Sequence, residues 1–186
     1  MKAVEFARHL GIETCLEFDP AIIVPEQQIR ALCQQNICGN YGNNYTCPPY
    51  VGTLEEINIK LRQFQRGLLL QYTKDIDVKG NREGVLQTRI GFHNRILQIE
   101  EFLRIKGIDP VWGMIGGNCG LCDSCKAKSN EPCPYPDKAR MSLEAIAVDV
   151  VGLLGRLGLD SEFHSDKITW TGCILFQHIP GTNLVG

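Results

Sequence analysis

The sequence predicts an α/β fold, a small open sheet accompanied by helices and by two cysteine-rich loops. Three features predict it: a long amphipathic segment, several short apolar or β-branched runs, and cysteines concentrated in two segments rich in glycine, asparagine and proline. The chain has 186 residues, of which 44% are hydrophobic and 22% charged, as in an ordinary globular protein. We therefore expect a single α/β domain over residues 1–186, with cysteine-rich loops at about 33–50 and 116–140.

Four elements are expected in the first half of the chain. They are a short helix or strand at 2–10, a helix at 25–32, a helix from 53 to about 63, and a buried strand at 68–72. Pro25 suits the first turn of its helix, and Thr53 with Glu56 forms a capping-box pattern at the start of the next.

The second half is expected to alternate between helices and strands. Its elements are a loop at 77–84, a helix at 85–106, a strand at 111–115, a helix at 142–157 and a strand at 168–177. On the long helix, His93 lies on the apolar face and is interpreted as a core histidine, whereas Glu100 and Glu101 are interpreted as surface charges. Asp149 is interpreted as a helix-surface residue, and Ser142 as an N-cap.

The second cysteine segment has a spacing that is typical of metal ligation. Cys119, Cys122, Cys125 and Cys133 form a C-x2-C-x2-C-x7-C run, and Pro134 follows the last cysteine. Bacterial ferredoxins hold cubane clusters with the similar run C-x2-C-x2-C-x3-C-P. The run therefore predicts a [4Fe–4S] site in a loop that follows a strand.

Zinc is the alternative at this run. Structural zinc sites usually combine two C-x2-C pairs across a longer spacer, or add histidines, and no histidine lies near these cysteines. The third closely spaced cysteine favours iron–sulfur over zinc, and both over inert thiols. Gly116, Gly117 and Gly120 let the backbone approach the sulfurs closely.

A second constellation lies upstream, where Cys33, Cys38 and Cys47 form a C-x4-C-x8-C pattern. Pro48 and Pro49 follow the last of them. Three cysteines in one irregular loop are seldom there for packing, although a single buried cysteine behaves as a small hydrophobe. The pattern predicts a second group of metal ligands.

The allocation of ligands between the two groups has three solutions. The upstream trio could hold its own cluster with one iron left open, or Cys15 or Cys173 could complete it. In two-cluster ferredoxins the fourth cysteine of a run serves the other cluster, so Cys133 could instead join the trio. The spacing alone leaves all three open.

Composition also limits the partners and the location. A net charge of −2 implies no broad attraction to nucleic acid or to a membrane surface, and no apolar run is long enough to span a bilayer. The first ten residues lack the apolar core of a signal peptide. With nine clustered cysteines, these features favour a reducing cytoplasm.

The two cysteine patterns carry a resemblance to a known family. With the stretches GGNCGLCDSC, PDKAR and MSLEAIAVDV, they make residues 33–177 similar to the DUF2284 family of predicted metal-binding proteins. The resemblance implies metal binding by a cytoplasmic iron–sulfur protein and names no reaction. The chain departs from the family's PSMEA-type stretch, where it has Met141–Ala145, but keeps Arg140 and Glu144.

Together these features predict a protein with one or two [4Fe–4S] clusters, serving electron transfer or cluster-based chemistry on a small molecule. A redox partner protein or a small-molecule substrate is the expected partner. The alternatives are a non-redox enzyme whose open iron binds a sulfur- or oxygen-containing substrate, and a zinc-stabilised interaction module. The sequence leaves open whether the protein is an enzyme, and it predicts no oligomeric state.

Overall fold

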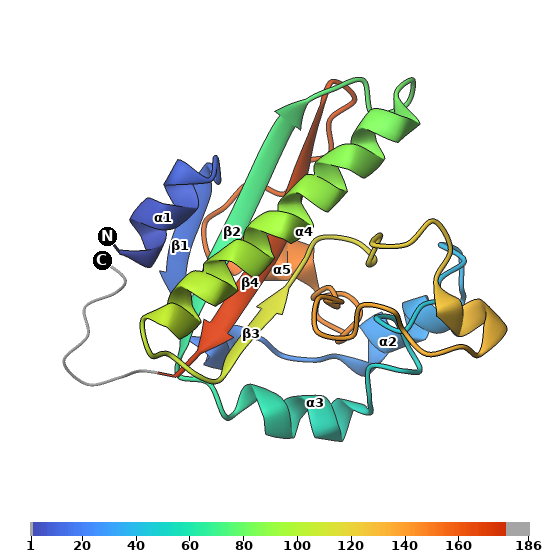
Figure 1. The fold of residues 1–186 in the computed structure, drawn as a ribbon, viewed down its shortest axis with the longest axis horizontal. Coiled ribbons are helices and arrows are strands. Elements are labelled where there is room, and N and C mark those ends of the chain that lie inside the picture. Colours follow the sequence, from blue (N-terminus) through green and yellow to red (C-terminus); the bar gives the residue numbers. More distant parts are fainter. Residues whose placement is uncertain (1, 178–186) are drawn as a thin grey trace.

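Residues 2–177 are described by the computed structural model as a four-stranded antiparallel sheet with helices on both faces (Figure 1). The strands are β1 (Thr14–Phe18), β2 (Arg66–Asp75), β3 (Val111–Met114) and β4 (Lys167–Phe176), in the order β1-β2-β4-β3. The helices are α1 (Ala3–His9), α2 (Gln27–Gln34), α3 (Leu54–Leu61), α4 (Arg82–Ile105) and α5 (Val150–Arg156), and Pro20–Ile22 and Lys126–Ser129 form short 3₁₀ turns. The α/β prediction is confirmed, whereas a single domain over 1–186 stays a prediction.

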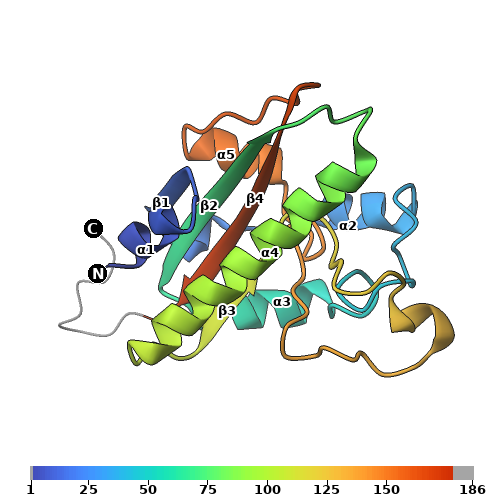
Figure 2. The same cartoon turned by 45° about the horizontal axis from the view of Figure 1, so that its top comes forward.

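The two central strands divide the core into two layers. β2 and β4 pair along their whole length, from Arg66 opposite Phe176 to Asp75 opposite Lys167. Because successive side chains of a strand point to opposite faces, Leu68 and Leu70 pack under α1 and α4, while Leu69 packs under α3 and α5. Figure 2 shows α4 crossing one face of the sheet and α5 on the other.

Several sequence predictions match the structure closely. The long helix predicted at 85–106 is α4, which begins slightly earlier because Asn81 accepts a hydrogen bond from Gly84 N at 2.8 Å. The capping box at α3 is present, with Thr53 N donating to Glu56 Oε2 at 2.7 Å. The last strand was expected at 168–177 and is β4.

The helix predicted at 142–157 is wrong over its first half. Residues 142–149 form buried turns, and only 150–156 are helical. Ala147 adopts φ +69°, which ends any helix, and its carbonyl accepts a hydrogen bond from Glu26 N at 2.7 Å. Asp149 is not a simple surface residue, because its carboxylate caps α5 by accepting from Gly152 N. β1 was not predicted at all.

The two cysteine-rich segments lie beside each other at one end of the molecule. In Figure 1 the segment that follows α2 and the segment that follows β3 meet to the right of β3, on the side of the sheet away from α1 and β1. The described helices include none that is long and apolar enough to cross a membrane.

Candidate metal centre

The upstream loop is shaped by its own hydrogen bonds. Cys33 lies in the last turn of α2, and Cys38 and Cys47 lie in the turns that follow. Gly42 N donates to Pro48 O at 2.8 Å, which brings the chain around Cys47 back onto itself. Gly42 adopts φ +69°, a conformation that glycine reaches without strain, so the local sequence explains this reversal.

The downstream loop begins where β3 ends. Ile115 N donates to Met141 O at 2.9 Å, so the two ends of the segment 116–140 are held together at the sheet. Between them the chain passes Cys119 and Cys122, forms the 3₁₀ turn that follows Cys125, and returns past Cys133. The prediction of a cysteine loop after a strand is thus confirmed.

Three side chains of the upstream loop join it to the downstream loop. Asn44 Nδ2 donates to Cys119 O at 3.2 Å, and Thr46 Oγ1 accepts from Cys119 N at 3.4 Å. Tyr45 donates its hydroxyl proton to Glu131 O at 2.8 Å. Asn44 and Thr46 are buried, so their two contacts with Cys119 are partly shielded from water, whereas the Tyr45 contact is exposed. The two cysteine constellations therefore form one continuous site.

The four downstream cysteines gather around one small cavity of about 20 Å³. Cys119, Cys122, Cys125 and Cys133 all line it, together with Tyr45 and other residues of both loops. Burial raises the pKa of the Cys119 thiol, and the nearby Cys133 and Cys122 act in the same direction. We call these four residues the quartet; in this arrangement Cys133 lies with the downstream cysteines.

Hydrogen bonds to sulfur also occur in the quartet. The backbone N–H groups of Leu121 and Arg140 donate to Cys119, which lowers the pKa of its thiol and opposes the effect of burial. The sequence predicted that the neighbouring glycines let the backbone approach the sulfur atoms closely. At Gly120 a Cβ would meet the end of the Arg89 side chain, Nη2, at 2.9 Å, so the glycine leaves room for this arginine beside the quartet.

The three upstream cysteines form a second group, which we call the trio. Burial raises the pKa of the Cys47 thiol to about 12, and Cys38 and Cys33 contribute in the same direction. Cys125 and Cys119 contribute less, so Cys47 is the member of the trio that faces the quartet. Cys33 donates its thiol hydrogen to Glu144 O at 3.8 Å.

The remaining two cysteines lie in the sheet. Cys173 is fully buried in β4, opposite Leu69 and Met114, and Cys15 lies in β1 opposite Leu70. Burial raises the pKa of both thiols, to about 11 for Cys15, and no other cysteine contributes to either shift. Both pack with apolar core residues, so the structure does not bring them to the trio.

The spacing of the sulfur atoms bears on the choice of metal. Within residues 2–177, no three cysteines have their sulfur atoms all within 4.8 Å of one another. A tetrahedral zinc ion with Zn–S bonds of about 2.3 Å holds its sulfurs only about 3.8 Å apart. The sulfur atoms therefore lie around a common space but are too far apart for three of them to bind one metal ion.

Each cysteine group has one arginine with a free buried donor. Arg30 lies one helical turn before Cys33, and its Nε and Nη2 have no hydrogen-bond acceptor among residues 2–177. Arg89, on α4, likewise has no acceptor for its Nε among residues 2–177. Its Nη1 donates to Asn118 Oδ1 beside Cys119. Burial lowers the pKa of both guanidinium groups, and the neighbouring Cys33 and Cys119 oppose that effect. These free donors fit an anionic group at each site, since a buried unpaired cation is costly.

A cleft of about 310 Å³ opens on the other side of the quartet. It is lined by Cys119, Cys122 and Cys125, by Arg89 of α4, and by asparagines of the upstream loop, Asn40, Asn43 and Asn44. Its size lies at the lower end of the range typical of small-molecule sites. The sequence did not indicate this cleft, because α4 contributes residues that are remote from both loops along the chain.

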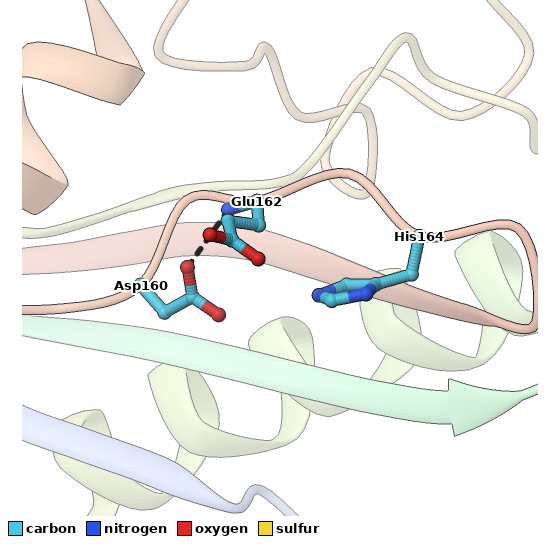
Figure 3. A group of neighbouring side chains, drawn as sticks. All are labelled: Asp160, Glu162 and His164. Carbon is cyan, nitrogen blue, oxygen red and sulfur yellow. Dashed lines mark hydrogen bonds between the residues drawn. The ribbon is translucent and has the colours of Figure 1, made fainter.

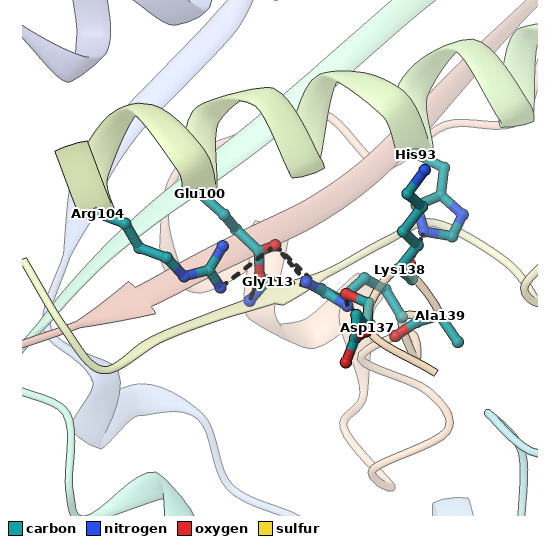
Figure 4. Close-up of polar contacts among 8 residues, drawn as sticks. His93, Glu100, Arg104, Gly113, Asp137, Lys138 and Ala139 are labelled. Carbon is teal, nitrogen blue, oxygen red and sulfur yellow. Dashed lines mark hydrogen bonds and ion pairs between the residues drawn. The ribbon is translucent and has the colours of Figure 1, made fainter. Parts of the chain in front are cut away.

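A buried ion pair ties the downstream loop to the sheet and to α4 (Figure 4). Glu100 is fully buried and accepts hydrogen bonds from Gly113 N at 2.6 Å and from Arg140 Nε and Nη2 at 3.0 and 2.6 Å. The interpretation of Glu100 as a surface charge is therefore wrong. Its position four residues after Ile96 on the apolar face could have indicated burial.

The histidine of α4 lies near the same segment. His93 is buried, as predicted, and its Nε2–H donates to Lys138 O at 2.8 Å. Burial lowers its pKa, so the imidazole stays neutral. His93 thus anchors the exit of the downstream loop.

One further group of possible ligands lies apart from the cysteines. Asp160, Glu162 and His164, before β4, place their ligand atoms within 4.8 Å of one another (Figure 3). The alternating D-x-E-x-H spacing could have drawn attention to them. The two carboxylates are exposed, and exposed acidic groups of this kind are common without a metal.

The joined cysteine loops have the donor chemistry of a metal-binding protein. The family comparison agrees: residues 17–176 match DUF2284, described as predicted metal-binding proteins, and the chain belongs to this family. The resemblance inferred from the two cysteine motifs is thereby confirmed. No curated protein matches the chain, and neither does any solved structure.

Proposed function

We propose that this protein is an iron–sulfur protein that binds two [4Fe–4S] clusters, for electron transfer or for cluster-based chemistry on a small molecule. The quartet holds one cluster with four thiolates, and the trio holds the other with three. The observation that carries the proposal is the division of the loop cysteines into neighbouring groups of four and three.

Two observations support iron–sulfur over zinc. The sulfur atoms are spread more widely than a single zinc ion requires. The free donors of Arg30 and Arg89 suit an anionic group at each site, and a cubane with thiolate ligands is anionic. Because these residues fit it, such a cluster would supply one-electron transfer or, at an open iron, Lewis-acid binding.

The protein's own residues would tune and shield these sites. Leu121 and Arg140 donate backbone hydrogen bonds to Cys119, and such bonds to sulfur raise the reduction potential of a cluster. Tyr45 borders the quartet cavity and limits access of water from that side. A reducing cytoplasm would keep the seven thiols of the two loops available for ligation.

Anaerobic purification and reconstitution, followed by counting iron and acid-labile sulfide, test the proposal. We expect about eight of each per chain. Cys122→Ser and Cys38→Ser are each expected to reduce the iron content by about half, since each removes a ligand from a different group. Cys15→Ser is the matched control, because Cys15 lies in the sheet, and it is expected to retain both clusters.

The result that would overturn the proposal is stoichiometric zinc without labile sulfide in anaerobic protein. In that case the colourless protein would unfold on chelation, as a zinc-stabilised interaction module does. Loss of all iron in either single variant would instead indicate one cluster shared by both groups.

A further inference from the structure

Arg30, one helical turn before Cys33, has a buried donor edge without an acceptor among residues 2–177. It exposes only 8% of its surface, and the one hydrogen bond of its side chain among the described residues runs from Nη1 to Gly52 O at 3.3 Å. Nε and Nη2, which have no acceptor there, lie on the same edge of the planar guanidinium. Two parallel donors on one edge match the two oxygens of a carboxylate.

Elsewhere in this protein, the same edge of another arginine is paired with a carboxylate. Arg140 uses Nε and Nη2 to bind the carboxylate of Glu100, with hydrogen bonds of 3.0 and 2.6 Å. Arg30 is buried to a similar degree but lacks such a partner, because no acidic side chain forms an ion pair with it in residues 2–177. The free edge of Arg30 therefore suits a planar anion, and residues 2–177 provide none there.

The position of Arg30 connects this edge with the trio. Residues three apart on a helix lie on one face, so Arg30 and Cys33 of α2 are neighbours, and each affects the charge of the other. Glu144 also affects Cys33, but its side chain is exposed and makes no hydrogen bond to Arg30. With Cys133 in the quartet and Cys15 and Cys173 in the sheet, the trio has no fourth cysteine.

We propose that the trio site binds a small carboxylate-containing molecule, whose carboxylate pairs with the free edge of Arg30 and whose sulfur or oxygen atom takes the fourth ligand position. The inference rests on the proposed function, because that position requires a metal centre at the trio. It adds the substrate class: a small organic acid with a thiol, hydroxyl or second carboxyl group. Binding would be a ligand exchange: the sulfur or oxygen atom of the acid would replace a water held at the trio's metal centre, the water and, for a thiol, its proton would go to solvent, and no electron would be transferred.

Two thiols that differ mainly in charge test this inference. Thioglycolate carries a carboxylate next to its thiol, whereas 2-mercaptoethanol carries a neutral hydroxyl. Each is titrated into reconstituted protein after iron and sulfide have been counted, and binding is followed by EPR and Mössbauer spectroscopy. We expect thioglycolate to perturb the spectrum at a concentration at least about tenfold lower than mercaptoethanol, as a charged bidentate pair implies.

Variants test whether Arg30 causes the preference for thioglycolate over 2-mercaptoethanol. Arg30→Met is expected to abolish the difference between the two thiols, and Arg30→Lys, which keeps the charge but loses the planar edge, to reduce it. Arg62→Met, at an exposed arginine outside both cysteine groups, is the matched control and should retain the wild-type preference. Iron content, measured for every variant, identifies any that has lost its clusters.

Two sets of results would overturn the inference while leaving the proposed clusters intact. One is equal affinity for the two thiols in wild-type protein with full iron and sulfide. The other is binding of thioglycolate only in Glu144→Gln, which would mean that Glu144 fills the fourth position. Absence of iron and sulfide before any thiol is added would overturn both proposals.

Discussion

At the scale of single residues, buried guanidinium donors without an acceptor among residues 2–177 mark the candidate metal centre. Arg30 and Arg89 each bring a guanidinium to one cysteine group and leave at least one donor free among the described residues. Such groups cost free energy in the metal-free protein, because desolvation of a cation is not offset by a hydrogen bond. They are tolerated where an anion completes the site.

Arg30→Met should stabilise the metal-free protein. The substitution removes a buried unpaired charge and keeps an extended apolar side chain, so we expect a gain of about 1–3 kcal/mol in the free energy of unfolding. Urea denaturation of the metal-free form measures it. The exposed Arg62→Met serves as the control and should change stability by less than about 0.5 kcal/mol. A clear loss of stability in Arg30→Met would show that the guanidinium is satisfied without an added anion.

His93 should make the protein sensitive to mild acid. Because burial lowers its folded-state pKa, the unfolded state binds a proton more readily below about pH 6.5. The stabilisation from neutral His93 is therefore complete above pH 6.5 and is lost as the pH falls below it, by at most about 1.4 kcal/mol per pH unit. Urea denaturation at pH 7.5 and 5.5 measures this loss, and His93→Gln should show a smaller one. An equal loss in both proteins would contradict the prediction.

At the scale of the helices and strands, hydrogen bonds involving α4 and β3 hold the downstream loop in place. The Glu100–Arg140 pair joins α4 to the loop exit, and Gly113 of β3 donates to the same carboxylate. A loop without regular structure is thereby fixed at a defined distance from the sheet.

Glu100→Gln should be strongly destabilising. It leaves Arg140 buried without its anion, for which we expect a loss of about 3–5 kcal/mol. Thermal or urea denaturation measures the loss, and faster amide exchange in residues 133–140 would show that the loop exit loosens. Glu101→Gln, on the exposed face of the same helix, is the matched control and should have little effect. Similar stabilities of the two variants would argue against a structural role for the pair.

Asn44→Ala should separate the two cysteine loops. Asn44 is buried and its side chain donates to Cys119 O, whereas the side chain of Asn43 donates to Gly39 O within its own loop. We expect a loss of about 1–3 kcal/mol and faster amide exchange around residue 119, with a smaller effect for Asn43→Ala. Hydrogen exchange followed by mass spectrometry distinguishes the two outcomes. Unchanged exchange at residue 119 in Asn44→Ala would mean that other contacts hold the loops together.

At the scale of the whole molecule, the hydrophobic core and the metal centre are separate. The trio and quartet cysteines belong to neither of the two core clusters, which are built on the sheet, its helices and the turns at 141–149. The sheet therefore has its own source of stability.

Metal removal should consequently loosen the cysteine loops and spare the sheet. We expect the far-UV circular dichroism and the amide protection of β2 and β4 to persist after chelation, while exchange in 33–50 and 116–140 accelerates. Leu69→Ala provides the contrast: it removes a fully buried side chain and should destabilise the sheet by about 2–5 kcal/mol with or without metal. Cooperative unfolding of the whole sheet on chelation would show that the stability of the sheet depends on the metal.

The sequence by itself determined the local features of this protein. α4 and the cap at Thr53 follow from periodicity and from side-chain hydrogen bonds between near neighbours, and the cysteine motifs reveal the family. The turns at 142–149 escaped prediction because their apolar residues imitate a helix, while contacts to Glu26 and Ile115 impose a different path.

Only the tertiary structure decided how distant parts of the chain meet. It placed Cys133 with the quartet, kept Cys15 and Cys173 in the sheet, buried Glu100 against Arg140, and set the edge of Arg30 beside the trio. The physical reason is that spacing along the chain governs contacts within a turn or a helix. Contacts between loops depend on how the sheet and its helices pack, and no local pattern encodes them.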